Sequence, residues 1–476
     1  MQGLPVLDDS DIPRVRRWDA VVLGGALPGL VTAAVLLMRG ARVLLVEEST
    51  ARAGFAGLRE PFLLSDAGSR GILGTCLREI GVPLIERRRI VSHPTAYQVV
   101  LPDARLDVGD PARTIEEIVA WGLAKPEEAQ ALVRALAHAA AAEREAMLRS
   151  PVIQKSGRRL RRAARHSPGH NVGAASDRAL RERGLPAEVT DASPRLAAYL
   201  AAQTRALSNL GSQSPSPEAQ ARLLGAPLEG TGVLRGGLRQ LLRQRLESLF
   251  ADFRAISGRL RLIGVANQPG LIPEGSSDIW VGRVLVLNAP REKLAVAHGD
   301  EPLPDLLRPS PSSHRRLCLH YRARRSVLPE GMAPRVICVG RSTGPLDPGH
   351  VVAIRVFPGS KRDDRVDLVA SAILPADADA TKAQADVTRV LEGLMPFTGN
   401  DGLQLETAAT PVWDMDEPLR DPGPGRGWPG PCDIRLSLKP PIYSLERADA
   451  AALGFEGDLL LGWRAGESIA ADLESG

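Results

Sequence analysis

Residues 18–47 read WDAVVLGGALPGLVTAAVLLMRGARVLLVE, and this stretch decides the fold. Its first part, Trp18–Leu23, is a short apolar run of the kind that forms a strand buried on both faces of a parallel sheet. Leu27–Arg39 is then apolar nearly all round and closes at Gly40, where a left-handed helix cap would lie. A second apolar run follows at Ala41–Val46. The stretch therefore predicts a strand, a helix and a second strand.

Glycines at the first turn and an acid after the second strand indicate a nucleotide site. Gly24, Gly25 and Gly29 allow a tight turn and let the start of the helix present unpaired N–H groups to a pyrophosphate. Glu47 lies 47 − 24 = 23 positions after the first glycine, close to the offset of about 20 at which an acid binds a ribose. Ala26 replaces the middle glycine, so its methyl group lies where the backbone would approach the phosphates. We assign these five residues to a dinucleotide site; the alternative is a strand–helix–strand unit that binds nothing.

The composition is that of an ordinary globular protein. The chain has 476 residues, of which 44% are hydrophobic and 24% charged, and it is too long for one simple core, so we expect two domains. The formal net charge of +4 gives no global field that would attract nucleic acid. No run reaches the roughly 20 apolar residues of a membrane-spanning helix. The first residues lack a signal-peptide core and the four cysteines form no CxxC pair, so we expect a cytoplasmic protein.

Periodic patterns predict elements further along the chain. Apolar residues recur with a helical period at three places: around Leu73, Leu77 and Ile80, over Lys125–Leu148, and within Gly232–Phe253. Apolar runs predict strands at Leu260–Val265 and Ile279–Leu287. Thr114 and Glu117 have the spacing of a capping box and predict the start of another helix.

The order of these features resembles the phytoene desaturase-like branch of the FAD-dependent amine oxidase superfamily. The N-terminal match is VVLGGALPGLVTAAVLLMRGARVLLVEE, and PFLLSDAG is similar to the family's F-x-x-D-x-G segment. AYQVVLPDARLDVGDP looks like its short strand pair, GVLRGGLRQL like its central P-x-G-G-h-x-x-L element, and VLVLNAP like the strand end that follows. The similarity extends over most of the chain, and its first segment is the specific one.

The resemblance implies an α/β fold with a Rossmann-like FAD/NAD(P)-binding domain, assembled from discontinuous segments and interleaved with an α+β substrate domain. The first domain would comprise residues 15–80, 228–297 and 445–476, and the second residues 81–227 and 298–444. FAD is the implied cofactor, and a hydrophobic small molecule, such as an isoprenoid or an amine, is the implied substrate. The difficult chemistry would belong to the flavin, which takes a hydride from a substrate carbon. We assign no catalytic residue, and the eight histidines show no spacing that predicts a metal site.

Three positions depart from the family pattern. Ala26 is one, and Ala53 stands before Gly54 where the family has paired glycines. In the C-terminal GDLLLGWRAGESIAADLESG, Gly462 matches the glycine of a Gly-Asp pair and Trp463 takes the acid's place. The resemblance adds three residues to the predicted cofactor site: Gly54, Val265 and Gly462.

These departures keep other functions open beside an FAD-dependent oxidoreductase. The second hypothesis is a non-catalytic or cofactor-poor relative that serves as a binding or assembly component. A plain NAD-dependent dehydrogenase would fit Gly24–Glu47 but not the later elements.

One dense basic run, Lys155–Arg165 (KSGRRLRRAAR), favours a membrane partner. It holds six cations and no acid. In a relative of enzymes that draw substrates from lipid, such a segment would rest on anionic headgroups at the inner face of the membrane, each basic residue adding about 1 kcal/mol. The alternative is a solvated loop.

Overall fold

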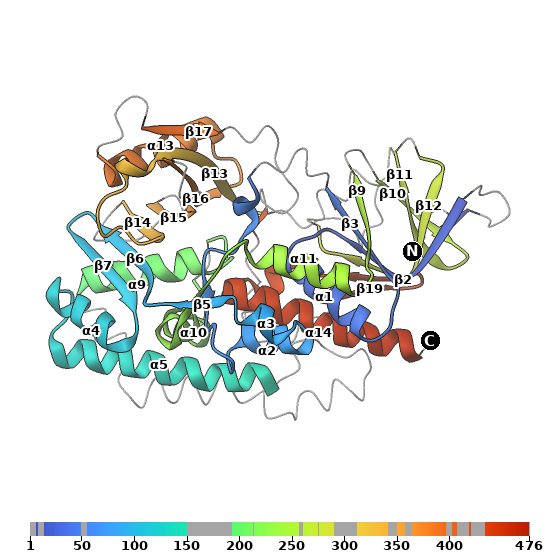
Figure 1. Cartoon of the computed structure of the whole chain (residues 1–476), viewed down its shortest axis with the longest axis horizontal. Helices are drawn as coiled ribbons and strands as arrows, with labels where there is room; N and C mark the ends of the chain where they lie inside the picture. Colours follow the sequence, from blue (N-terminus) through green and yellow to red (C-terminus); the bar gives the residue numbers. More distant parts are fainter. Residues whose placement is uncertain are drawn as a thin grey trace.

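The computed structural model describes residues 6–7, 14–48, 55–149, 193–212, 214–256, 260–274, 276–289, 312–340, 350–357, 364–396, 402–406, 418–419 and 434–475. Ala53, Gly54 and the basic run Lys155–Arg165 lie outside these ranges. The described chain forms an elongated molecule with a β-sheet toward each end and helices beside and between the sheets (Figure 1). Both termini lie at the end that carries the first strands.

The first sheet contains the predicted nucleotide-type unit. Its strand order is β1-β10-β11-β12-β2-β3-β9, and β20, paired with β19, joins β12. Its strands are β1 Val6–Leu7, β2 Arg14–Leu23, β3 Val43–Glu48, β9 Asp252–Ile256, β10 Leu260–Val265, β11 Gln268–Pro273, β12 Asp278–Leu287, β19 Arg435–Leu438 and β20 Pro441–Ser444. Strands β12, β2, β3 and β9 run parallel. The central strands are apolar where they are covered on both faces, at residues 20–23 of β2, in the first part of β3 and at the end of β12, whereas the edge strand β9 reads DFRAI and is largely not buried.

Helices α1 (Leu27–Met38) and α14 (Gly454–Ser475) pack against each other on this sheet. They approach closely at Gly462, where an added Cβ atom would lie 2.5 Å from the carbonyl oxygen of Pro28. Helix α1 is buried along most of its length because α14 and α11 (Leu238–Ser248) cover the sides that the sheet leaves open. The predicted strand–helix–strand unit is confirmed, and so is the α/β class.

The second sheet has the order β17-β13-β16-β15-β14-β6-β7, with β18 beside β13. Its strands are β6 Thr95–Leu101, β7 Ala104–Gly109, β13 His314–Arg324, β14 Arg335–Val339, β15 Val351–Phe357, β16 Arg365–Pro375, β17 Leu403–Glu406 and β18 Pro418–Leu419. Helices α4 (Pro111–Ala120), α5 (Pro126–Arg149) and α9 (Pro194–Leu207) share one apolar core with this sheet, and α13 (Ala380–Leu394) shares another.

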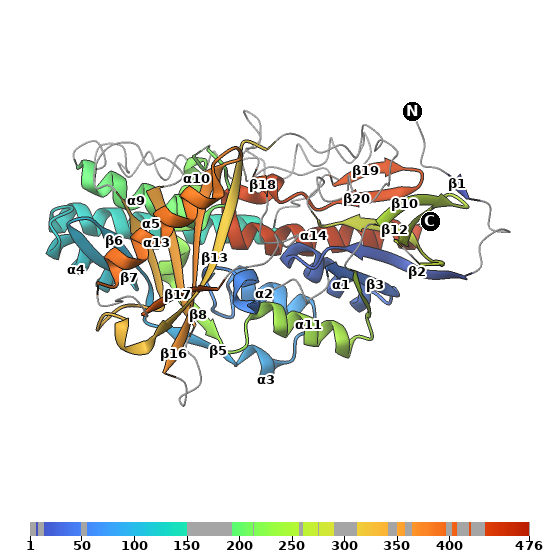
Figure 2. The same ribbon diagram turned by 90° about the horizontal axis from the view of Figure 1, so that it is seen from above.

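Short elements connect the two sheets. A three-stranded sheet has the order β4-β8-β5. The connecting elements are η3 Ala56–Arg59, β4 Leu64–Ser65, α2 Ile72–Glu79, α3 Leu84–Arg87, β5 Ile90–His93, α10 Pro217–Gly225, η5 Ala226–Glu229 and β8 Thr231–Leu234. Viewed from above, α2, α3, β5 and α11 lie along one side of the molecule (Figure 2).

Two predicted helix boundaries are wrong. The cap of α4 is Asp110, whose carboxylate accepts a hydrogen bond from Arg113 N at 3.1 Å. Thr114 lies inside that helix, because Asp110 and the proline after it already start the helix. The helix predicted within Gly232–Phe253 ends at Ser248, since Phe250 adopts a left-handed conformation with φ = +62° and the chain continues as β9.

Among the described helices, none is both long and apolar enough to cross a bilayer.

Candidate cofactor and substrate site

The turn between β2 and α1 leaves the start of α1 open. Gly24 has φ = +103°, a conformation that favours glycine, and its N–H donates to Val46 O at 2.8 Å. Ala26 is the N-cap residue, and no side chain caps the helix. The N–H groups of the first turn and the positive end of the helix dipole are therefore available to an anion. Ala26 and Leu27 both line a cavity, so this helix start faces open space.

Asn288, which directly follows β12, holds this turn in place. Its side-chain Nδ2 donates to the carbonyl oxygens of Gly24 at 3.2 Å and Ala26 at 3.1 Å. Any Cβ on Gly29 would collide with the Asn288 amide, and one on Gly24 would lie 2.8 Å from Ala289 N. The absence of a side chain at Gly24 and Gly29 is thus needed for the close packing of the turn against Asn288 and Ala289, whether or not a phosphate binds. Asn288 Oδ1 is buried and accepts no hydrogen bond from the described residues. Sequence reasoning missed Asn288, although the segment that contains it, VLVLNAP, resembles a strand end of the family pattern.

Glu47 lies at the same turn and already has a cationic partner. Its carboxylate folds over Gly25, where an added Cβ atom would collide with it. Arg243 of α11 forms an ion pair with Glu47 and places its guanidinium 4.6 Å from the centre of the Phe253 ring. The predicted ribose acid is therefore oriented by an arginine that is 196 residues away in sequence.

The other two described cofactor predictions lie elsewhere. Val265 ends β10, which β11, β12 and β2 separate from β3, and it is buried in a small apolar cluster. The residue that pairs with Glu47 across the neighbouring strand is Ala255 of β9. Gly462 and Trp463, which the resemblance matches to a Gly-Asp pair, both lie inside α14. The strand before α14 is β20, and Gly462 makes a contact between helices.

A cavity of about 150 Å³ connects the start of α1 with the second sheet. Its apolar lining residues come from the start of α1, from η3 and the segment before β4, from α9, α10 and η5, and from the start of α14 and the residue before it: Ala26, Leu27, Leu58, Pro61, Phe62, Leu63, Ala206, Leu207, Leu223, Ala226, Leu453 and Phe455. Its charged lining residues are Arg59, Glu60, Arg222, Arg239, Arg316, Arg355, Arg447, Glu456 and Asp458. Arginines outnumber acids six to three in this lining, and two of the six, Arg222 and Arg447, are paired with the acids Glu456 and Asp458 of the same lining.

A segment between η3 and β4 spans from the second sheet to α11 along the cavity wall. Arg355 of β15 donates to the carbonyl oxygens of Gly57 at 2.7 Å and Pro61 at 3.0 Å, and also to that of Glu60. The Glu60 carboxylate accepts hydrogen bonds from Leu238 N at 2.7 Å and from Arg239 N, and so caps α11. Burial lowers the pKa of Arg355 to about 10 and raises the pKa of Glu60 above its ordinary value. Arg355 is thus held by carbonyl groups of this segment, and Glu60 is held by the first N–H groups of α11.

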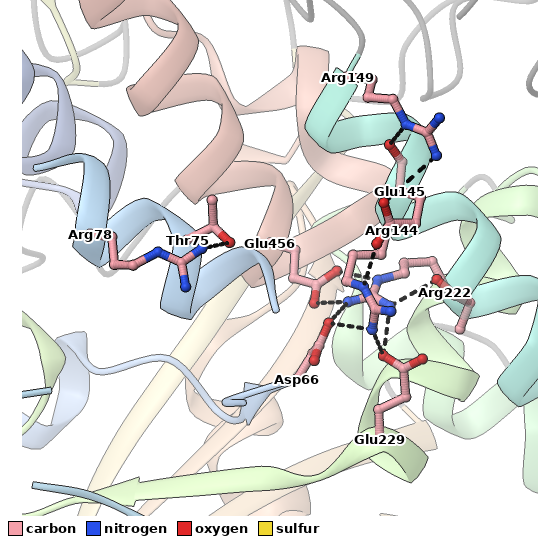
Figure 3. A network of polar contacts seen from close by, with 10 residues as sticks. Asp66, Thr75, Arg78, Arg144, Glu145, Arg149, Arg222, Glu229 and Glu456 are labelled. Atoms are coloured by element: carbon pink, nitrogen blue, oxygen red, sulfur yellow. Dashed lines mark hydrogen bonds and ion pairs between the residues drawn. The ribbon is translucent and has the colours of Figure 1, made fainter. Parts of the chain in front are cut away.

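A buried ion network lies at the other wall of the cavity (Figure 3). Arg222 of α10 is fully buried and donates two hydrogen bonds of 2.7 Å to Glu456 in the first turn of α14. It also donates to Asp66, at 2.7 Å, and Arg144 of α5 forms ion pairs with Asp66 and Glu229. Burial raises the pKa of Glu456, although Arg222 opposes this shift. The network ties the start of α14 to helices that sequence reasoning did not connect with it.

The described residues contain no group of three or more His, Cys, Asp and Glu side chains that is placed to hold a metal ion. The site therefore consists of an open helix start, a strand-end carboxylate and a cavity with apolar and cationic walls.

No family model matches the sequence, and no curated protein matches it. Solved structures are similar over nearly the whole chain. An engineered putrescine oxidase is 14% identical with a TM-score of 0.54, covering 97% of this chain and 100% of that one. Cyclohexylamine oxidase from Brevibacterium oxydans IH-35A is 15% identical with a TM-score of 0.51, covering 96% and 99%. An oxidoreductase from Methanosarcina mazei is 11% identical with a TM-score of 0.50, covering 92% and 98%. At these identities the likeness is one of fold: the chain has a mixed α/β fold similar to that of these enzymes over nearly its whole length.

Proposed function

We propose that this chain is an FAD-dependent oxidoreductase that takes a hydride from a hydrophobic small molecule. One observation carries the proposal: a single cavity joins the open start of α1, at Ala26 and Leu27, to the second sheet, at Cys318, Arg355 and Ser371. A cofactor bound at the first sheet and a substrate bound against the second would therefore share one space. The fold of two amine oxidases over nearly the whole chain supports the same assignment.

The residues around the turn fit a dinucleotide. The uncapped N–H groups of α1 suit a pyrophosphate, and Glu47 suits a ribose. Asn288 Oδ1, buried beside the turn, offers an acceptor. Bound FAD would supply the acceptor for two electrons and a hydride. The protein's own contribution is to hold this cofactor with residues 15–80, 228–297 and 445–476, and to exclude water from the reacting carbon with apolar side chains such as Phe62 and Leu207.

The charges of the cavity lining indicate what kind of substrate fits. Each acid in the lining already has partners: Glu456 binds Arg222, Asp458 binds Arg447 at 2.6 Å, and Glu60 caps α11. An ammonium group would therefore meet a wall with more cations than acids. We therefore favour a mainly apolar substrate whose polar group is neutral or anionic. A cationic amine is disfavoured; putrescine, the ligand in one of the similar oxidase structures, is an example of such an amine.

The second hypothesis, a relative without redox chemistry, keeps two observations in its favour. Ala26, at the N-cap of α1, carries a methyl group where the dinucleotide fingerprint has a glycine, and Arg243 already pairs with Glu47. Visible absorbance decides between the two functions. Protein that is incubated with FAD and then separated from free FAD should keep the flavin spectrum, and addition of substrate without oxygen should bleach it. Colourless protein after this treatment would favour the binding or assembly role.

A further inference from the structure

We propose that one side of the molecule binds the surface of an anionic membrane. We call it the arginine face; it consists of Met38, residues 78–94 and residues 233–250. Six of the seven large hydrophobic side chains that are exposed among the described residues lie on it: Met38 (44%), Leu84 (54%), Ile85 (74%), Val91 (63%), Val233 (38%) and Phe250 (92%). The seventh, Trp121, lies elsewhere: it follows α4, which packs beside β7 of the second sheet. Figure 2 shows α3, β5 and α11 along one side of the view.

Contacts between neighbouring segments make this face continuous. Val91 and Val233 are direct partners on adjacent strands, so their side chains lie side by side. Arg89 donates to the carbonyl oxygen of Arg235 at 3.4 Å.

On the other side of α3, Arg245 of α11 donates to Ile80 O at 3.0 Å and contacts Met38 Sδ at 3.0 Å. These contacts connect Met38, Val91 and Val233 with the chain on both sides of α3.

Leu84 and Ile85 belong to α3 itself, and Phe250 directly follows α11. Such a group differs from apolar side chains scattered singly over a surface, which would need no explanation.

Arginines outnumber acids on this face. Residues 78–94 contain four arginines and two glutamates, and residues 233–250 contain four arginines and one glutamate. Of these arginines, Arg239 lines the cavity and Arg243 also pairs with Glu47. Glu86 pairs with Arg89 at 2.5 Å and Glu247 pairs with Arg243 at 3.6 Å, so two of the three acids are already bound by arginines of the same face. The whole chain, by contrast, carries a formal net charge of only +4.

An anionic bilayer satisfies both properties at once. Guanidinium groups bind phosphates of the headgroups, and apolar side chains on separate elements can each enter the interface without a complementary partner shape. A second copy of this chain fits less well, because a two-fold interface brings each patch against its own equivalent and would set arginines against arginines. The proposal is independent of the basic run Lys155–Arg165, and it does not require that the protein bind FAD.

Sedimentation with vesicles tests the proposal on the full chain. Wild-type protein is expected to pellet with phosphatidylcholine vesicles that contain phosphatidylglycerol, to stay in solution with pure phosphatidylcholine, and to be released by salt. Arg88→Ser and Arg235→Ser should each lower the partition coefficient about fivefold, which corresponds to about 1 kcal/mol per basic residue. Ile85→Ser combined with Leu84→Ser should also weaken binding, since it removes the two apolar side chains of α3.

Two variants on other surfaces serve as matched controls. Trp121→Ser removes an exposed apolar side chain, and Arg134→Ser removes an exposed cation of α5. Both should pellet like the wild type, and circular dichroism should show that all variants remain folded. Equal pelleting with both kinds of vesicle, no pelleting with either, or equal losses in the controls would overturn the proposal. So would a dimer in light scattering that dissociates with Ile85→Ser, because a second copy would then cover the face.

Discussion

Arg243 of α11 forms an ion pair with Glu47 at the end of β3. Glu47 is the acid that the nucleotide fingerprint places at the ribose, and the two residues are brought together by α11 packing against α1. The arginine holds the carboxylate over Gly25, so a ribose must share Glu47 with Arg243 or displace it.

Glu47→Ala should reduce flavin content. The substitution removes the carboxylate that would accept hydrogen bonds from the ribose and leaves the turn at Gly24 unchanged. Flavin released from a known amount of protein measures the occupancy. Glu247→Ala, which removes another acid beside Arg243, is the control and should keep wild-type occupancy. Full flavin content in Glu47→Ala would count against this site.

Ala26→Gly should raise flavin occupancy. The methyl group lies at the N-cap of α1, and its removal would allow closer approach of the backbone to the pyrophosphate. Titration with FAD, followed by protein fluorescence quenching, measures the change in affinity. If neither the wild type nor this variant binds FAD at any concentration tested, the site has been lost for other reasons, and the binding or assembly hypothesis gains.

Arg222→Met should destabilise the fold by about 3–5 kcal/mol, because it leaves the carboxylate of Glu456 buried without its cation and leaves Asp66 with Arg144 alone. Urea unfolding followed by circular dichroism measures the loss. Adding Glu456→Gln to this variant should recover part of it, since one unpaired buried charge disappears. A single variant as stable as the wild type would show that the network does not hold α14.

Gly462→Ala should destabilise the protein by about 1–3 kcal/mol, the usual range for an overpacked core. The added Cβ atom would lie 2.5 Å from Pro28 O and 2.9 Å from Val31 Cβ, so α1 and α14 would have to separate. Gly393→Ala in α13 is the matched control, because an added Cβ atom there meets nothing within 4 Å. That control should be neutral or more stable by up to about 1 kcal/mol, since alanine favours the helix. Equal melting temperatures for the two variants would contradict the close contact.

The burial of Glu60 predicts a pH dependence of stability. Burial raises its pKa in the folded state, so the folded protein binds this proton more tightly than the unfolded chain. The stabilisation from that proton is present below the ordinary glutamate pKa and is lost as pH rises through the raised value. Glu60→Gln should therefore show a smaller fall in unfolding free energy over this interval, measured by urea titrations at several pH values. Glu86→Gln, on the surface, should keep the wild-type slope. An unchanged slope in Glu60→Gln would refute the assignment.

Local sequence patterns were sufficient to predict the core of the first sheet. An apolar strand, a glycine turn, an apolar helix and a second apolar strand follow each other within residues 18–47, and each has its own short-range signature. The structure has β2, α1 and β3 at these places. Thr114 and Phe250 show the limit of such patterns, because one capping residue or one left-handed residue moves a helix end.

Only the tertiary structure decided which distant residues complete the site. Asn288 reaches Gly24 across 264 positions, Arg222 reaches Glu456 across 234, and Arg243 reaches Glu47 across 196. These contacts depend on strand order and helix packing, and periodicity within a window of a dozen residues carries no information about either. For the same reason, Gly462 could be matched to the glycine of a Gly-Asp pair from its letters alone, whereas its contact with Pro28 exists only because α14 packs on α1. The sequence by itself determined the nucleotide-type unit, and the packing of the remaining chain around it determined the cavity, its charge and the arginine face.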